Sequence, residues 1–460
     1  MSAIITDPFK KQFMQKILDE VTNLDARYYV GIGKNDEWNS TETVPAPTDT
    51  PKTIREAQNA LQSVKAVAST SFVIPRHNWS SGNEYSGYDD QFTTIPSNTY
   101  YVLTEDNHVY ICLQQSKSAT GAANKSIIKP TGTSPKPFKT SDGYTWRFLY
   151  ALSAADSTSF LSANFIPVKL VDSANNAFEI QQKTAQDSAD AGRILNIVIE
   201  NQGTGYSSAP TVTITGNGGA IGDSAQATAV VSGGNVVKID MLNESAGSGR
   251  NFVNATVTIT PTSGGSGCIA RAVLGPPNGI GADPRDDLKA TSLMFNSKPD
   301  GTENGDFLAG NDQDFRQVML IRNPTIDSAN GSVLTATTAK ALKYMLVDSA
   351  FAGQLQIDEL LTSDATPAAK AYVNEIGPIG NPSGGGRKVY YHQTDSTGYT
   401  PFAVGNTVTD EGAQTGTIVT TADSNELYIN TSGEVLYIEN RAPVTRTSTQ
   451  TEDIKIVVTL

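Results

Sequence analysis

The first amphipathic pattern along the chain lies close to its N-terminus. Phe9, Phe13, Ile17 and Val21 recur at every fourth position with charged residues between them, and Pro8 suits a first helical turn. This spacing predicts an α-helix of about four turns. Its apolar face is expected to dock onto the core of this protein or onto a neighbouring protein.

A second helix is predicted over residues 53–67, because Ile54, Leu61 and Val64 share one helical face. Most other apolar runs are short and are bounded by Gly, Pro or Asn, which is typical of strands. The predicted strands cover residues 27–33, 99–103, 109–113, 145–152, 315–322, 434–439 and 453–460, with a turn at 440–443. Residues 335–347 fit both a helix and a strand.

Residues 195–274 contain an internal repeat with a period of roughly 40 residues, which bears directly on the architecture. The first copy comprises ILNIVI (194–199), PTVTI (210–214) and AQATAVV (225–231), and the second comprises VVKIDM (236–241), ATVTI (255–259) and CIARAVL (268–274). Alternation of Thr with apolar residues is the signature of half-buried strands. We interpret the repeat as two copies of a small β unit packed side by side.

Composition narrows the function. The chain of 460 residues exceeds one ordinary core, so several compact units are expected. Lys and Arg total 34 against 47 Asp and Glu, and this acidity without a basic run argues against a nucleic-acid partner. We expect no signal peptide and no membrane insertion, because no apolar run approaches the length of a bilayer span. Cys112 and Cys268 lie in strand-like segments and are expected to be free thiols in a reducing compartment.

Signatures of catalysis and of cofactor binding are missing from the sequence. His77, His108 and His392 have no second His or Cys at metal-ligand spacing, and no nucleophile elbow or phosphate-binding loop is present. We therefore expect no enzyme activity, no cofactor and no metal. Two acidic loops, 283–287 and 300–306, offer oxygen ligands but lack the regular carboxylate spacing of a calcium loop. Two interpretations of these loops remain: their carboxylates are solvated turn residues, or they bind an ion.

Three tryptophans are candidate structural or interface residues. Trp38, Trp79 and Trp146 each lie beside polar residues. Such rings anchor cores when the indole nitrogen is satisfied, and they also serve as platforms for sugars. Both interpretations stay open from the sequence alone.

Six segments, taken in order, resemble the dimer-forming baseplate wedge subunit of T-even-like contractile-tailed bacteriophages. They are VGIGKNDEW (30–38), VIPRHNW (73–79), VYICL (109–113), DGYTWRFLY (142–150), DFRQVMLIRNP (314–324) and GEVLYIENRAP (433–443), the last continued by QTEDIKIVV (450–458). The resemblance covers roughly residues 1–180, 280–330 and 431–460. The stretches between these parts have no counterpart in the shortest members of the family and look like insertions.

The resemblance implies a mainly β, multidomain fold with minor α content: β-sandwiches, some with flanking helices, plus the small inserted β repeats. We expect an N-terminal α+β part of the wedge frame at 1–185, the inserted tandem repeat at 190–275, a C-terminal frame domain from 276–330 and 431–460, and a second β-rich insertion at 331–430. The implied partners are a second copy of the chain, in a homodimer, and other baseplate wedge subunits. The implied location is the tail baseplate of a virion assembled in the host cytoplasm.

The family has no catalytic residues to carry over, so the matched segments are expected to be structural. Arg76, Arg316, Arg322 and Arg441 each lie near a turn or a strand end, where a guanidinium ties backbone carbonyls or a carboxylate. Those contacts fix the loops of this chain or join it to another subunit. Two rival functions remain: a receptor- or carbohydrate-binding tail protein that uses the repeat, and a tail-associated glycosidase, for which no carboxylate pair stands out.

Overall fold

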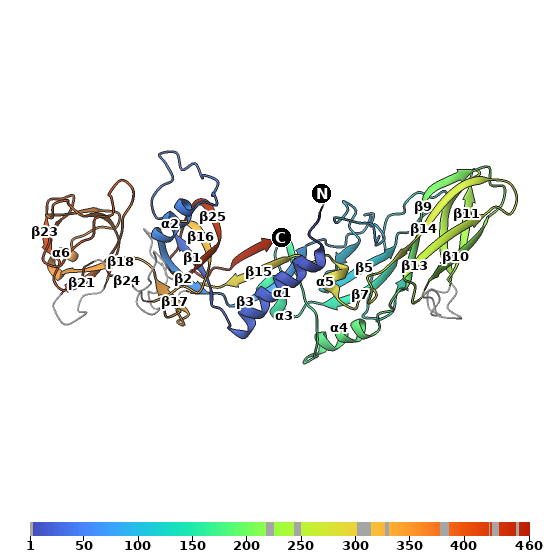
Figure 1. Ribbon diagram of the computed structural model, residues 1–460, viewed down its shortest axis with the longest axis horizontal. Coiled ribbons are helices and arrows are strands. Elements are labelled where there is room, and N and C mark those ends of the chain that lie inside the picture. The colour runs from blue at the N-terminus through green and yellow to red at the C-terminus, as the bar shows by residue number, and fades with distance from the viewer. Residues whose placement is uncertain are drawn as a thin grey trace. The chain divides into compact units, whose positions relative to one another are not determined.

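The computed structural model describes residues 3–217, 225–242, 250–300, 314–326, 331–377, 386–422, 424–425, 432–447 and 450–460 (Figure 1). The chain is mainly β with a few helices and several antiparallel sheets, which confirms the predicted fold class. Both cysteines are free, as expected; Cys112 is buried and Cys268 is half-buried.

The chain divides into two compact units. Unit 1 comprises Met1–Met14, Ser71–Ser292 and Thr459–Leu460, and unit 2 comprises Gln15–Thr70 and Leu293–Val458. Residues 15–70 share unit 2 with the C-terminal frame segments that follow Ser292. Four elements run across the unit boundaries: α1 (Asp7–Asn23), β3 (Ser69–Pro75), β15 (Ser292–Ser297) and β26 (Ile454–Thr459).

A sheet rich in aromatic residues organises the first part of unit 1. Its antiparallel strands, in spatial order, are β4 (Tyr101–Leu103), β5 (His108–Gln114), β7 (Thr145–Ala151) and β6 (Phe138–Lys139). Trp146, Phe148, Tyr110 and Tyr144 are completely buried in its core, together with Ala185 of a covering helix. The other elements here are α3 (Ala154–Phe160), β8 (Phe165–Val168), which pairs with β3, the covering helix α4 (Ala177–Asp187), and α5 (Pro284–Asp287).

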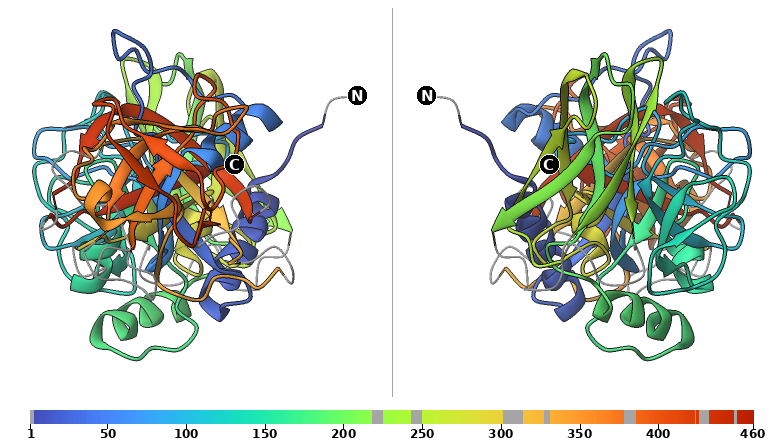
Figure 2. Two further views of the ribbon diagram at one scale, coloured as in Figure 1. Left: turned by 90° about the vertical axis from the view of Figure 1, so that its left-hand side faces the viewer. Right: turned by 90° about the vertical axis from the view of Figure 1, so that its right-hand side faces the viewer.

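The two sequence repeats form one sheet in which their strands are exchanged. The first copy supplies β9 (Ile194–Thr204), β10 (Thr211–Asn217) and β11 (Gln226–Ser232), and the second supplies β12 (Asn235–Leu242), β13 (Asn254–Thr260) and β14 (Ser266–Leu274). The spatial order is β12-β11-β10-β13-β14-β9, so the first strand of each copy pairs with the last strand of the other. Figure 1 shows β9 beside β14, and the right-hand view of Figure 2 shows the repeat sheet in green on the side facing the viewer. The prediction of two units packed side by side is therefore wrong in this respect.

The exchange gives the repeat module one shared core. Interchanging the two copies reproduces the same strand order, which is an internal pseudo-twofold arrangement. The outermost strands β9 and β12 also contact each other, and Ile197, Val236 and Ile239 from these two strands share a hydrophobic cluster. A three-stranded copy alone leaves its apolar face open to water, whereas the exchanged pair packs the apolar faces of both copies into one cluster.

A charged contact attaches the repeat module to the rest of unit 1. The Arg271 guanidinium on β14 lies 2.6 Å from Asp89 and 3.1 Å from Asp90, and Asp90 also accepts the Leu274 backbone N–H. Replacing Arg271 by methionine should cost about 1–3 kcal/mol and speed amide exchange in residues 86–92, because it removes charge-assisted hydrogen bonds. Hydrogen exchange measures this. Lys238→Met, which breaks a more exposed pair with Asp240 in the same module, should leave these amides unchanged.

Unit 2 contains a five-stranded antiparallel sheet assembled from distant parts of the chain, called the frame sheet below. Its strands, in spatial order, are β17 (Thr338–Lys340), β2 (Leu61–Ala66), β1 (Tyr28–Gly33), β16 (Asp314–Arg322) and β25 (Glu434–Thr445). Strand β1 is buried along its whole length because it pairs on both sides, with Tyr28 opposite Arg322 of β16. Strand β25 continues through residues 440–443, so the turn predicted there is wrong.

The second predicted helix ends early. Helix α2 (Pro51–Asn59) begins at an N-cap, Thr50, whose hydroxyl accepts the Thr53 backbone N–H at 3.1 Å. The chain then becomes β2, in which Val64 lies opposite Gly31 of β1 and is completely buried. Leu61 and Val64 match a helical period, but the chance to pair with a buried strand overrides that local preference.

The remaining part of unit 2 is called the inserted module. Its seven-stranded sheet has the order β23-β22-β19-β20-β21-β18-β24 around a core that includes Met345, Phe351, Tyr391 and Phe402. The ambiguous segment 335–347 proves to be two strands, of which β17 belongs to the frame sheet. The elements of the module are β18 (Lys343–Asp348), α6 (Ser349–Ala352), β19 (Leu360–Ser363), β20 (Lys370–Ile376), β21 (Gly386–His392), β22 (Thr407–Thr409), β23 (Thr415–Thr417) and β24 (Ser424–Asn425).

Candidate functional site

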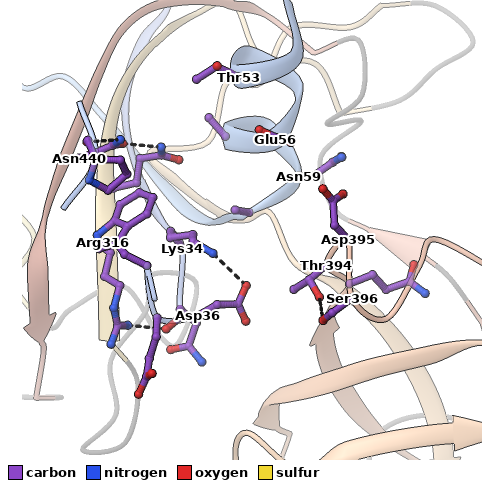
Figure 3. Close-up of a pocket in the computed structure, with 18 of the residues that line it drawn as sticks. Lys34, Asp36, Thr53, Glu56, Asn59, Arg316, Thr394, Asp395, Ser396 and Asn440 are labelled. Atoms are coloured by element: carbon purple, nitrogen blue, oxygen red, sulfur yellow. Dashed lines mark hydrogen bonds and ion pairs between the residues drawn. The ribbon is translucent and has the colours of Figure 1, made fainter. Parts of the chain in front are cut away.

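A cleft of about 1130 Å³ lies in unit 2 between the frame sheet and the inserted module (Figure 3). One wall consists of the loop that follows β1, helix α2 and the first residues of β16. The other wall consists of the loop that follows β21, with contributions from β20 and from Asp358. Glu56 on α2 and Asp395 on the second wall face the space between them in Figure 3.

A close backbone contact turns the chain out of β1 and into the cleft. A Cβ atom at Gly33 would lie 2.3 Å from the Ala60 carbonyl oxygen, so only glycine permits this approach. The Lys34 N–H donates to the same carbonyl at 2.8 Å, and Lys34 has a φ of +67°. The residues that follow, Asp36 to Trp38, are thereby directed along the cleft wall.

Arg316 holds this loop against the frame sheet. It is only 5% exposed, and its Nε and Nη2 atoms donate to Glu42 at 3.1 and 2.7 Å. Its Nη1 donates to the Asn35 carbonyl oxygen. The sequence predicted that this guanidinium ties a carbonyl or a carboxylate, and it binds both within this chain.

Trp38 forms part of the cleft lining and is half-buried. Its indole N–H donates to the Arg441 carbonyl oxygen at 2.9 Å, and the Lys34 ammonium lies 5.6 Å from the ring centroid. The sequence left two alternatives for Trp38, a core anchor and an open platform. In the structure its indole N–H is satisfied, as in a core anchor, while part of its ring stays accessible, as in a platform. Trp38, Arg316 and Arg441, which come from three distant motif segments, meet at this site.

A chain of polar side chains links the two walls of the cleft. His392 on β21 lies between Asn374, at 2.6 Å from Nδ1, and Asp36, at 2.5 Å from Nε2. Burial of Asp36 would raise the pKa of its carboxyl, but the hydrogen bond from His392 and the nearby Lys34 charge lower it overall. An ionised Asp36 only accepts, so His392 Nε2 carries the proton in this contact.

Asp358 is a second acidic group at the junction of the two walls. Its carboxylate accepts from the Asn35 side-chain amide at 2.5 Å. Partial burial raises the pKa of Asp358, and the neighbouring Asp36 charge adds to this effect. The sequence did not single out Asp36, Asp358 or His392, because only the fold brings residues so far apart in the chain together.

The contact between Arg316 and Glu42 predicts a dependence of stability on pH. The hydrogen bonds from Arg316 hold the pKa of Glu42 below its usual range. A carboxyl with a lowered pKa in the folded state contributes stability above its unfolded pKa and loses it as the pH falls through the folded value. Urea unfolding from pH 7 to 3 should therefore show Glu42→Gln less stable than wild type at neutral pH and indistinguishable from it at the acid end. A difference between the two proteins that stays constant over this range would contradict the prediction.

The other candidates from the sequence lie elsewhere and serve their own surroundings. Arg76 donates to Asn78 and to the Ser162 carbonyl oxygen, and the Trp79 indole donates to Ser126 at 3.2 Å. Trp146 is completely buried in the core of unit 1. In unit 2, Arg322 binds Glu20 at 3.1 Å and Glu434 at 3.0 Å.

The acidic loops do not form a visible ion site in the described part of the chain. Asp283 caps α5 and binds Arg285 and Lys11, so the loop at 283–287 serves as a helix start. Most of the second loop, residues 301–306, lies outside the described residues. Across the described ranges, no group of three or more His, Cys, Asp or Glu side chains is placed to hold a metal ion.

No protein-family model matches the chain, and no curated protein matches it either. None of the described helices has the length and apolar character that a bilayer crossing requires.

Proposed function

We propose that this protein is a structural subunit that acts by binding other proteins and not by catalysis. Within that class, we propose a baseplate wedge subunit of a contractile-tailed bacteriophage, which forms a homodimer and binds other wedge proteins in the virion. It takes no cofactor, and its assembly takes place in the host cytoplasm.

One observation carries the proposal. Three of the six ordered motif segments, 30–38, 314–324 and 433–443, supply the adjacent strands β1, β16 and β25 of the frame sheet. Their signature side chains also contact one another or the same loop: the Trp38 indole meets the Arg441 carbonyl, and Arg316 binds Asn35. Half of the resemblance therefore falls on three adjacent strands of one sheet. The segments without family counterparts form sheets of their own, except that β17 joins the edge of the frame sheet.

Exposed apolar residues near the N-terminus support an assembly role. Phe9 and Phe13 on α1 are 60% and 49% exposed. Ile4 and Ile5, just before the helix, are both more exposed than these two rings. In α1 only Met14 is buried. The apolar face of this helix was expected to dock either onto the core of this chain or onto a neighbouring protein. The exposure of Phe9 and Phe13 favours the neighbouring protein.

Two measurements test the proposal. Sedimentation at micromolar concentration should show a dimer, and an antibody against the purified protein should label the baseplate end of tails in virions of the phage that encodes it. A monomer throughout that range would count against the homodimer. Label confined to capsids, or absent from intact and disrupted virions alike, would overturn the baseplate assignment.

A rival function has one specific observation in its favour. On the repeat module, Thr211, Thr213 and Thr215 of β10 lie opposite Thr260, Thr258 and Thr256 of β13, and all six are exposed. Such a face offers hydroxyls in regular rows to a carbohydrate receptor. A glycan array with the full chain decides between the two: binding that is lost when these threonines become valine would favour a receptor-binding tail protein.

A further inference from the structure

The cleft in unit 2 has more anionic than cationic side chains in its lining. Six carboxylates line it against two cationic side chains, Lys34 and Arg316. Both cations are engaged, since Lys34 lies 3.3 Å from Asp36 and Arg316 binds Glu42. The carboxylates in the lining are Asp36, Glu37, Glu56, Asp314, Asp358 and Asp395.

Two amide oxygens, one from each wall, point to the kind of group that is missing. Gln317 on the frame wall is only 5% exposed, and its Nε2 donates to Asn440 at 2.8 Å. Gln393 on the opposite wall donates from Nε2 to the carbonyl oxygens of Lys370 and Thr400, which fixes the orientation of its amide. Among the described residues, no donor reaches the buried Oε1 atom of either glutamine. Both oxygens are buried beneath the lining. Together with the carboxylates at its surface, they favour a ligand that brings N–H or O–H donors.

Aromatic rings add a second preference. Trp38, Tyr372 and Tyr399 line the same cleft, and Tyr399 is 50% exposed. The Lys34 ammonium above the Trp38 ring already demonstrates a cation at an aromatic face here. Planar guanidinium groups stack on such rings and also donate to carboxylates in pairs.

We propose that this cleft binds a basic peptide segment of a partner protein through arginine or lysine side chains. Asp36, Glu56 and Asp314 already pair with Lys34, Lys52 and Arg316. The other three carboxylates of the lining, Glu37, Asp358 and Asp395, have no Lys or Arg partner among the described residues, so the lining keeps a negative charge that repels nucleic acid and that an uncharged sugar would leave unbalanced. The cleft volume of about 1130 Å³ exceeds one side chain and accommodates a short segment. The ligand chemistry stands on the cleft alone, whereas the identity of the donor as another wedge subunit rests on the proposed function.

Titration of the full chain with a probe peptide tests the proposal. The probe is a Gly-Arg-Gly-Arg-Gly peptide with both ends blocked. Its binding is measured by calorimetry, and also by tryptophan fluorescence because Trp38 lines the cleft. Its control replaces arginine by citrulline, which keeps the shape and removes the charge. We expect saturable binding, at least tenfold weaker for the citrulline peptide and weaker again in high salt.

Two substitutions locate the probe. The double variant Glu56→Gln, Asp395→Asn neutralises one carboxylate on each wall and should weaken binding at least tenfold. Asp187→Asn makes the same kind of change on α4, where the side chain is 62% exposed and paired with Lys183. This matched control should bind as wild type does.

Three results would overturn the cleft assignment. They are equal affinity for the arginine and citrulline peptides, equal loss in the cleft and control variants, and saturable binding of an N-acetylglucosamine tetramer with none of the peptide. Failure here is distinguishable from failure of the proposed function, because dimer formation and virion labelling do not depend on the probe.

Discussion

Replacing Arg147 by methionine is expected to destabilise unit 1 by roughly 3–5 kcal/mol, because it removes the guanidinium charge that opposes the effect of burial on the Asp287 carboxyl. Arg147 is 2% exposed, and its Nη2 donates to the Ala185 carbonyl oxygen at 2.9 Å. Asp287 is 1% exposed and accepts the Gly281 N–H at 2.7 Å. Gly281 lies between the two charges: a Cβ there, at a φ of +92°, would come within 2.7 Å of the guanidinium.

The same pair gives the variant a dependence on pH. Burial raises the pKa of Asp287 well above its usual range, and the Arg147 charge opposes that rise. A carboxyl with a raised pKa favours the folded state at low pH, and this contribution is lost as the pH rises through the folded value. The loss of stability in Arg147→Met should therefore be larger at pH 8 than at pH 5.

A second variant distinguishes charge from packing. Arg147→Met combined with Asp287→Asn keeps an acceptor for the Gly281 N–H and removes the isolated charge, so it should recover part of the lost stability at pH 8. Hydrogen exchange of strands β5 and β7, recorded across urea concentrations, reports on unit 1 directly. A double variant that is less stable than Arg147→Met at pH 8 would contradict the electrostatic argument.

Local pattern predicted the fold well wherever one strand face or one helix face was clear. The segments that became α1, β1, β5, β7, β16 and β26 were predicted because their apolar spacing and their turn residues agree. Helix α4 was not predicted, because its large apolar residues, Phe178 and Ile180, are exposed and do not mark its buried face. Its place depends on Gln182 and Gln186, which are buried and bind each other and the backbone near Val171. Such contacts are visible only after the chain has folded.

The exchange of strands between the repeats illustrates another limit. The sequence shows two similar copies, but β9 prefers β14 of the other copy to its own β11. The last strands of the two copies share the same alternating apolar pattern, so the choice depends on which pairing closes the shared core around Ile197 and Ile239. Periodicity therefore identifies the strands and leaves their order open.

The cleft was only partly accessible to sequence reasoning. Trp38, Arg316 and Arg441 were found because they lie in recognisable motif segments. Gln317 and Gln393 were missed, since a glutamine in a strand or loop carries no signal of its own. They matter because the amide nitrogen is held by hydrogen bonds while the oxygen meets no donor from the described part of the chain. That property arises from the packing of two walls far apart in the chain.

The largest loss from removing a single apolar group is expected for Trp146→Ala, at about 3–5 kcal/mol. The ring is completely buried, stacks on Tyr144 at a centroid distance of 5.8 Å, and meets Tyr85 edge-on at 5.6 Å. Truncation to alanine opens a cavity in the hydrophobic core beside Tyr85 and Tyr144, which the surrounding rings cannot close without moving. Thermal unfolding monitored by near-ultraviolet circular dichroism measures the loss of stability, because packed aromatic rings such as those of this cluster give a signal in that range.

Trp146→Phe distinguishes the loss of packing from the loss of a hydrogen bond. Among the described residues, no acceptor meets the Trp146 indole N–H, so phenylalanine removes volume but no hydrogen bond, and it should cost clearly less than alanine. Trp79→Ala is the contrasting control, because that half-buried ring gives up a hydrogen bond to Ser126 but little core volume. Equal losses for Trp146→Phe and Trp146→Ala would mean that an unseen polar contact of the indole, and not its packing, stabilises the core. Because Trp146 belongs to unit 1, none of these variants should change the binding of the arginine peptide to the cleft of unit 2 while unit 2 remains folded.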